Sequence, residues 1–473
     1  MSRSARRTLI IVSLALFMVV LDNLVVTVAL PSIRRSFGAG VQSLEWTVNA
    51  YTLSYAVLLL TGAALGDRFG RRLMFIVGLA IFTGASAAAA LAPDTGLLIA
   101  ARAIQGSGAA IATPLTLTLL AEAFPVERRG LALGVWSAIG GVAVAMGPLV
   151  GGAVITVLNW HWIFWINVPV GLVVLPFAAR GLSESHGPYG RLDLPGLALG
   201  SAGLLGIVYG LVHSQSVGFG ATTVVVPIAA GVGLIGAFVL WELRAESPML
   251  PMGFFAERSF LITNLASLAM YFGMFGSIFF LTQDLQIVLH NSPLHAGLKL
   301  LVWTGTTMVV APVAGVLSAR WGSRPFLAAA LASQALALTL LATTASTHTP
   351  YTTLLLPFVL AGGGMGLFFA PAASAVLAAV RPDQAGQASG ATNTIREVGG
   401  VFGVAVLASV FSSHGSYASG QAFVNGIVPA LWVGVGVLGA FAVLVAIVPW
   451  RSHAVVPAPA PVSASENTAA AAM

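Results

Sequence analysis

The chain has 473 residues, of which 58% are hydrophobic and 8% are charged. About a quarter of the residues of a soluble globular protein are charged, so this composition excludes a water-soluble globule. The net charge of +6 does not indicate a nucleic-acid partner, because the basic residues lie at the ends of apolar segments, where they face lipid headgroups. The absence of cysteine excludes disulfides, thiol catalysis and cysteine metal ligands.

Fourteen apolar stretches follow one another along the chain. Each is long enough to cross a bilayer of about 30 Å as a helix, and none shows the alternation of barrel strands, so the sequence predicts an all-α integral membrane protein. The first seven lie near residues 8–30, 44–65, 73–92, 95–121, 130–157, 160–178 and 194–214. The second seven lie near residues 221–241, 260–286, 295–318, 325–344, 352–378, 387–412 and 428–449.

Arginine residues gather in alternate gaps between these stretches. If the N-terminus is cytoplasmic, the outer gaps hold Arg34, Arg35 and Lys299. The inner gaps then hold Arg3, Arg6, Arg7, Arg68, Arg71, Arg72, Arg128, Arg129, Arg180, Arg191, Arg244, Arg258, Arg320, Arg324, Arg381 and Arg451. Cytoplasmic loops are rich in basic residues, so this distribution predicts a multi-pass protein of the plasma membrane with both termini in the cytoplasm.

An internal repeat divides the chain. The loop AALGDRFGRR, residues 63–72, aligns with GVLSARWGSR, residues 315–324. The repeat predicts two six-helix halves with the seventh and eighth helices inserted between them, and such halves place a substrate site at their interface near the middle of the bilayer. The expected parts are a bundle at 1–180, a linker with two extra helices at 181–259, a second bundle at 260–451, and a disordered Pro/Ala/Ser-rich tail at 452–473.

Six segments, one of them within the repeated loop, carry a resemblance to a known family. They are LDNLVVTVALP (residues 21–31), WTVNAYTL (46–53), GDRFGRR (66–72), RAIQGSG (102–108), GPLVGG (147–152) and WHWIFWINVPVG (160–171). Together with the helix count, they resemble the fourteen-helix drug:proton antiporters of the major facilitator superfamily, the DHA2 group. One departure is that the second-half copy of the signature loop has Ala319 where the first has Asp67.

The signature loop carries the charged residues Asp67, Arg68, Arg71 and Arg72 around Gly70. Glycine allows a tight turn, and the charges can form ion pairs at the membrane surface. The resemblance implies that the loop is a latch for one conformation, with Asp67 near the positive end of a neighbouring helix. The alternative is a solvated loop that only fixes the topology.

The segment GPLVGG contains Gly147, Pro148, Gly151 and Gly152 within the expected fifth helix. Proline frees a backbone carbonyl, and glycines let helices approach closely. The resemblance implies a hinge and seal between the halves, characteristic of antiporters. Packing of small residues without any hinge is the alternative.

Three ionisable groups are expected inside the membrane. At a rise of about 1.5 Å per residue, Asp22 lies roughly 21 Å from the cytoplasmic face, and Arg102 reaches nearly the same level from outside. A buried acid needs a partner or a function, so we expect Asp22 to exchange protons under the influence of Arg102, or to form a permanent bridge between the first and fourth helices. Glu397 lies near the middle of the thirteenth helix and is a second candidate, for a proton, for a cationic substrate or for a structural hydrogen bond.

The sequence contains no nucleotide-binding loop, zinc motif or nucleophile elbow, so no enzyme activity, cofactor or metal is expected. The predicted function is the export of small hydrophobic or amphipathic compounds in exchange for protons, by a monomer whose partners are the drug-like substrate, protons and the lipid bilayer. An exporter of a single antibiotic or metabolite and a solute:proton symporter remain as alternatives. The sequence does not identify the substrate-binding residues.

Overall fold

The computed structural model describes residues 3–186, 193–246, 248, 250–380 and 385–449. The predicted tail at 452–473 lies outside the described residues, as do Arg191, Arg381 and Arg451, which contributed to the predicted orientation. All regular elements of the described part are helices. This confirms the predicted all-α class.

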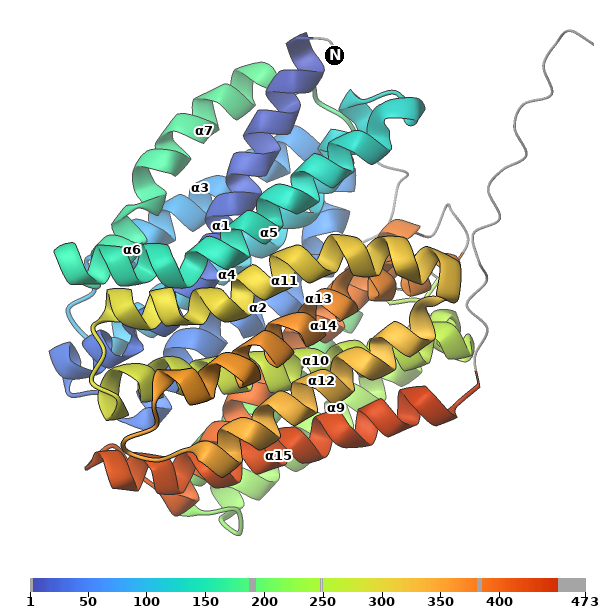
Figure 1. Cartoon of the computed structure of the whole chain (residues 1–473). Coiled ribbons are helices and arrows are strands. Elements are labelled where there is room, and N and C mark those ends of the chain that lie inside the picture. Colours follow the sequence, from blue (N-terminus) through green and yellow to red (C-terminus); the bar gives the residue numbers. More distant parts are fainter. Residues whose placement is uncertain (1–2, 187–192, 247, 249, 381–384, 450–473) are drawn as a thin grey trace, which may run out of the picture.

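The helices form a first group, a connecting pair and a last group (Figure 1). The first group comprises α1 (Arg3–Phe37), α2 (Val41–Phe69), α3 (Arg71–Ala90), α4 (Thr95–Ala123), α5 (Val126–Val157), α6 (Trp162–Trp165) and α7 (Asn167–Gly181). The pair is α8 (Leu194–Val217) and α9 (Thr222–Glu242), followed by the short helix η1 (Met252–Ala256). The last group comprises α10 (Arg258–Gln283) with its π-helical extension η2 (Asp284–Val288), α11 (Pro293–Trp321), α12 (Ser323–Thr344), α13 (Tyr351–Ala378), α14 (Ala385–His414) and α15 (Gly420–Ile447).

Twelve helices of the described part are long and apolar enough to cross a membrane. The number is thirteen if the two arms of α2, which meet at a bend of 50°, form one span. α6 and α7 together make one of these spans, and α10 with η2 makes another. The chain is therefore a multi-pass membrane protein.

The two groups repeat the same packing. α2 packs on α4 and α1 on α5, just as α11 packs on α13 and α10 on α14. Glycines make these approaches possible: a Cβ on Gly62 of α2 would lie 2.3 Å from the carbonyl oxygen of Ala110, and a Cβ on Gly362 of α13 would lie 2.1 Å from that of Trp303. Small residues at these positions let helix backbones touch, which is the main source of helix association in lipid.

Contacts between the groups concentrate at one end of the molecule. The Gln286 side chain donates to the Val28 carbonyl at 2.9 Å, and the Leu294 amide donates to Thr156 Oγ1 at 3.2 Å. Val28 and Thr156 lie in the C-terminal parts of α1 and α5, and Leu294 lies at the start of α11. From this end α5 and α11 diverge towards the end at which the N-terminus lies (Figure 1).

Candidate functional site

The Asp22 carboxylate lies in a buried polar network inside the first group. Asp22 is 2% exposed and Arg102 is fully buried, and their Oδ2 and Nη1 atoms are 2.6 Å apart. The Asp22 Oδ1 atom accepts hydrogen bonds from the side chains of Asn167 at 2.6 Å and Gln105 at 2.9 Å. Gln105 also donates to Ser86 Oγ at 2.8 Å. The network thus joins α1, α3, α4 and α7.

Every group that contacts the Asp22 oxygens in this network is a hydrogen-bond donor. An ionised carboxylate only accepts hydrogen bonds, whereas a protonated one must also donate its proton. The arrangement therefore fits the ionised form of Asp22, with the positive charge of Arg102 and two amides offsetting the loss of hydration. Protonation of Asp22 would remove the negative charge that pairs with Arg102, so the strength of the Arg102 contact bears on proton binding.

Arg102 is positioned by α2 as well as by Asp22. Its Nε atom donates to the Thr47 carbonyl at 3.2 Å, and its Nη1 atom donates to Gln105 Oε1 at 2.6 Å. The guanidinium carbon lies 4.2 Å from the centroid of the Tyr51 ring, a distance at which a cation is attracted to the ring face. Arg102 Nη2 has no hydrogen-bond partner among the described residues.

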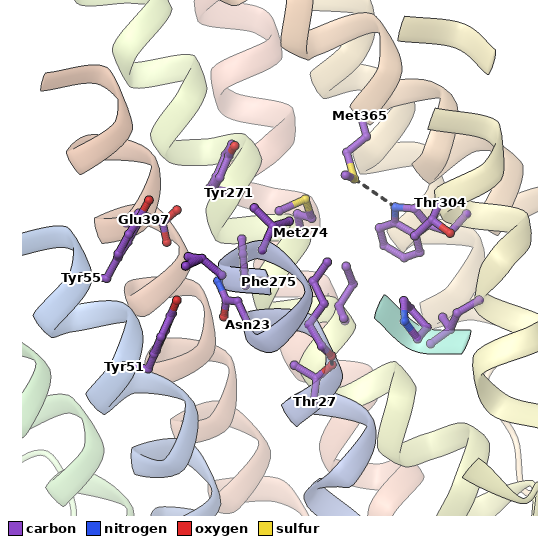
Figure 2. Close-up of a pocket in the computed structure, with 17 residues that line it drawn as sticks. Asn23, Thr27, Tyr51, Tyr55, Tyr271, Met274, Phe275, Thr304, Met365 and Glu397 are labelled. Carbon is purple, nitrogen blue, oxygen red and sulfur yellow. Dashed lines mark hydrogen bonds between the residues drawn. The ribbon is translucent and has the colours of Figure 1, made fainter. Parts of the chain in front are cut away.

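A cavity of about 190 Å³ lies between the two groups (Figure 2). It is close to this network, because Tyr51, which contacts Arg102, is one of its lining residues. Its wall is mostly apolar and aromatic, as is usual for a site that binds small organic molecules. The lining residues are Val19, Val20, Asn23, Leu24, Thr27, Tyr51, Tyr55, Pro148, Tyr271, Met274, Phe275, Ile278, Leu300, Trp303, Thr304, Met365 and Glu397. Both groups contribute, so the cavity occupies the interface that the repeat predicted for the substrate.

Polar atoms without partners face this cavity from both sides. They are Asn23 Oδ1 and the Tyr51 hydroxyl from the first group, and Glu397 Oε2 from the last group, none of which has a hydrogen-bond partner among the described residues. Arg396, adjacent to Glu397, turns instead towards Tyr271, whose ring centroid is 5.7 Å from its guanidinium carbon. These unsatisfied atoms are candidates for hydrogen bonds to a bound molecule.

The signature loop is held by residues of the first group and of the segment that follows α7. Arg71 bridges Asp67 at 2.8 Å and also contacts Glu122. The Glu184 carboxylate accepts from the backbone amide of Arg72 at 2.9 Å and from that of Leu73 at 3.2 Å, at the start of α3.

Gly70, in the turn of this loop, has a φ of +109°, and a Cβ there would lie 2.8 Å from Glu184 Oε1. The ion pair of Asp67 is with Arg71, four residues further along the same loop. Arg68 is exposed, and its guanidinium lies over the ring of Phe69. Neither Asp67 nor Arg68 forms an ion pair with the last group among the described residues.

The GPLVGG segment lies where α5 meets α1 and α11. A Cβ on Gly147 would lie 2.6 Å from the Leu24 Cβ, and one on Gly151 would lie 3.3 Å from the Val25 backbone. Gly152 is the most constrained, because a Cβ there would lie 2.4 Å from the carbonyl oxygen of Pro293 on α11. The neighbouring Pro148 has its own carbonyl directed at Gly297 of α11, where a Cβ would lie 2.1 Å away.

The comparisons with known proteins agree with this architecture. The family model for the Major Facilitator Superfamily matches residues 12–404 and, in a second match, 263–471. The chain belongs to this superfamily. The puromycin resistance protein pur8 of Streptomyces alboniger is 38% identical over 92% of this chain and 90% of its own length. The multidrug resistance protein Stp of Mycobacterium tuberculosis is 34% identical over 87% of this chain and 77% of its own length.

A solved transporter structure shares the fold. It is a bacterial homologue of the human lysosomal transporter Spinster, in an inward-facing and occupied conformation, with a TM-score of 0.64 and 18% identity over 94% of this chain and 98% of that one. The protein is thus a membrane transporter of the major facilitator superfamily and not an enzyme, and it is related to drug and antibiotic resistance proteins.

Three further residues of the site lie within the motifs, although the motifs alone did not identify them. Gln105 lies in RAIQGSG, three residues after Arg102 and hence on the same helix face, and Asn167 lies in WHWIFWINVPVG. Tyr51 lies in WTVNAYTL. Glu184 was missed altogether, since it lies in the linker outside every motif.

Proposed function

We propose that the protein exports small hydrophobic or amphipathic compounds by alternating access, in exchange for protons. The observation that supports this most is the position of the buried Asp22–Arg102 network directly behind one wall of the cavity between the two groups. A cavity at the interface of two repeats is the expected place for the substrate, and an intramembrane acid is the expected place for the proton.

We further propose a DHA2-type topology of fourteen spans. The bent α2 and the 32-residue α5 add to the twelve spans already counted. Both termini would be cytoplasmic, in the plasma membrane of a monomer, with bundles at residues 1–180 and 260–451 and the linker at 181–259. With this orientation the contacts between α5 and α11 seal the outer end, so the structure corresponds to an inward-facing state.

The predicted roles of the site residues follow from this scheme. Asp22 exchanges the proton, Arg102 governs when it does so, and Glu397 binds substrate or a second proton from the opposite wall. The signature loop, with Asp67, Arg68, Gly70, Arg71 and Arg72, is proposed to engage the last group after the inner ends approach. Its local contacts here are consistent with a latch that is open in the inward-facing state.

For the GPLVGG segment, we propose that Gly147, Pro148, Gly151 and Gly152 form the outer seal and the hinge. The supporting observation is that backbone atoms of α11 lie within 3 Å of the position a Cβ on Gly152 would take. Such a contact breaks completely when the helices separate, which makes it suitable for a seal that opens and closes.

The substrate range distinguishes two versions of this proposal, a multidrug exporter and an exporter of a single compound. The relative pur8 is named for one antibiotic and Stp for many drugs, so both a multidrug exporter and an exporter of a single compound fit the family. The mostly apolar wall of the cavity supports a broad range, because apolar contacts are weakly selective. A symporter of the same fold would move its solute inwards.

Transport by everted membrane vesicles tests the proposal. Acidifying the vesicle interior should drive ethidium uptake by the wild type, and a protonophore should abolish it. Asp22→Asn should lose this gradient-driven uptake, and Asp22→Glu should retain part of it. Glu257→Gln, a change at an exposed acid, is the control. Full gradient-driven uptake by Asp22→Asn would refute the proton role of Asp22. Ethidium uptake by the wild type that does not depend on the proton gradient would refute antiport.

A further inference from the structure

Tyr51 stands between the Asp22 network and the cavity. The residue is 1% exposed, one face of its ring contacts the Arg102 guanidinium at 4.2 Å, and it also lines the cavity. Its hydroxyl has no hydrogen-bond partner among the described residues. Figure 2 shows this hydroxyl directed towards the side of the cavity where Tyr55 and Glu397 lie.

The backbone beneath Tyr51 is fixed against α4. A Cβ on Gly106, one turn after Arg102, would lie 2.3 Å from the Tyr51 carbonyl oxygen, so the two helix backbones touch here. One turn earlier on α2, the Thr47 carbonyl accepts from Arg102 Nε. Because this contact prevents the α2 backbone from moving closer to α4, rotation of the side chain is the movement left to the Tyr51 ring at this point, and the cavity is the space into which the ring can turn.

The charged and titratable groups around Tyr51 come from four helices. Asp22 on α1 and Arg102 on α4 lie behind the ring, while Tyr55 on α2 and Glu397 on α14 lie on the cavity side, and Tyr51 is within electrostatic range of all four. Beyond Glu397 lie Arg396 and Tyr271. Among these groups, Arg102 contacts both Tyr51 and Asp22 directly.

We propose that Tyr51 is the positioning residue that couples occupancy of the cavity to proton exchange at Asp22. A bound compound packs on the cavity side of the ring and keeps it against Arg102, so that Arg102 stays paired with the carboxylate and opposes its protonation. When the compound leaves, the ring turns into the cavity, Arg102 loses one of its contacts, and Asp22 takes up the proton. Compound and proton thereby exclude each other, as exchange requires.

This inference rests on the proposed proton role of Asp22 but is separable from it by a binding experiment. Ethidium binding to the purified full-length protein in detergent is measured by fluorescence over a range of pH. If binding displaces one proton, the dissociation constant of the wild type rises by up to about tenfold for each unit of decreasing pH. Asp22→Asn should abolish this dependence.

Three tyrosine variants then separate the ring from its hydroxyl. Tyr51→Leu removes the ring face on Arg102, so the affinity should become independent of pH, as in Asp22→Asn. Tyr51→Phe keeps the ring and should retain the wild-type pH dependence, with a changed affinity if the hydroxyl contacts ethidium. Tyr55→Leu is the matched control, because Tyr55 also lines the cavity and stacks on Tyr51 with ring centroids 6.1 Å apart. It should weaken binding without altering the pH dependence.

The outcomes distinguish the two ideas. If binding by the wild type depends on pH through Asp22 but Tyr51→Leu has the same dependence, the coupling role of Tyr51 is wrong and the proton role of Asp22 survives. If Asp22→Asn and the wild type respond to pH alike, the proposed function itself fails at Asp22. Should Tyr51→Leu not fold, Tyr51→Met, which also lacks the aromatic face, replaces it under the same criteria.

Discussion

The contact between Gly152 on α5 and the start of α11 gives a direct test of how the two groups are held together. A Cβ on Gly152 would lie 2.4 Å from the Pro293 carbonyl oxygen and 2.8 Å from the Leu294 Cα. Both are backbone atoms, so no side-chain rotation relieves the clash and the helices must separate. Overpacking of this kind costs about 1–3 kcal/mol. Gly152→Ala should therefore lower the population of the state seen here, relative to the opposite state, by about 5- to 150-fold.

The distance between α5 and α11 measures this change. Because the chain has no cysteine, spin labels can be attached at two introduced cysteines without background labelling. Val157 and Leu298 are 77% and 44% exposed, so cysteines there are accessible to the label. Gly152→Ala should shift the distance distribution to longer values. Gly305→Ala on α11, whose Cβ would meet nothing within 4 Å, is the control. Identical distributions for the two variants would refute the reasoning.

Two further predictions concern residues that support the site. Asn167→Leu removes a hydrogen-bond donor to the buried Asp22 carboxylate, so it should lower the free energy of unfolding in detergent by about 1.5–3 kcal/mol. In an Asp22→Asn background, where the charge is absent, the loss should be clearly smaller. Equal losses in both backgrounds would contradict the direct interaction. Glu184→Gln weakens the acceptor at the start of α3 and should cost about 0.5–2 kcal/mol by thermal melting. Glu257→Gln, at a helix start where the side chain makes no capping hydrogen bond, should cost less.

The encounter of Asp22 with Arg102 was predictable from the sequence because helix geometry is nearly constant. A fixed rise per residue places both residues at a similar depth, and an unpaired charge at that depth is costly, so the structure brings them together as the estimate suggested. The same reasoning extends to Gln105, one turn from Arg102 on the same face. It does not extend to Asn167, since the rotation of α7 against α1 depends on packing that no short motif encodes.

The signature loop marks a different limit of sequence reasoning. Its charges and its glycine predicted a tight turn with ion pairs, and Gly70 does adopt a positive φ beside the Asp67–Arg71 pair. The partner at the start of α3, however, is Glu184, which reaches the loop from the segment after α7. Contacts of this kind depend on where a connecting segment runs, and hydrophobic periodicity carries no information about that path.

The two intramembrane acids differ in what a rocking motion does to them. The hydrogen-bond partners of Asp22 belong to α4 and α7, within its own group of helices, so movement of the first group as a body leaves its hydrogen bonds intact. Glu397 faces the first group across the cavity from α14, so the same movement changes its surroundings. Rigid-body motion alone therefore does not couple the conformational change to protonation of Asp22. The signal has to come through a side chain that contacts both the network and the cavity, and Tyr51 meets that requirement through Arg102.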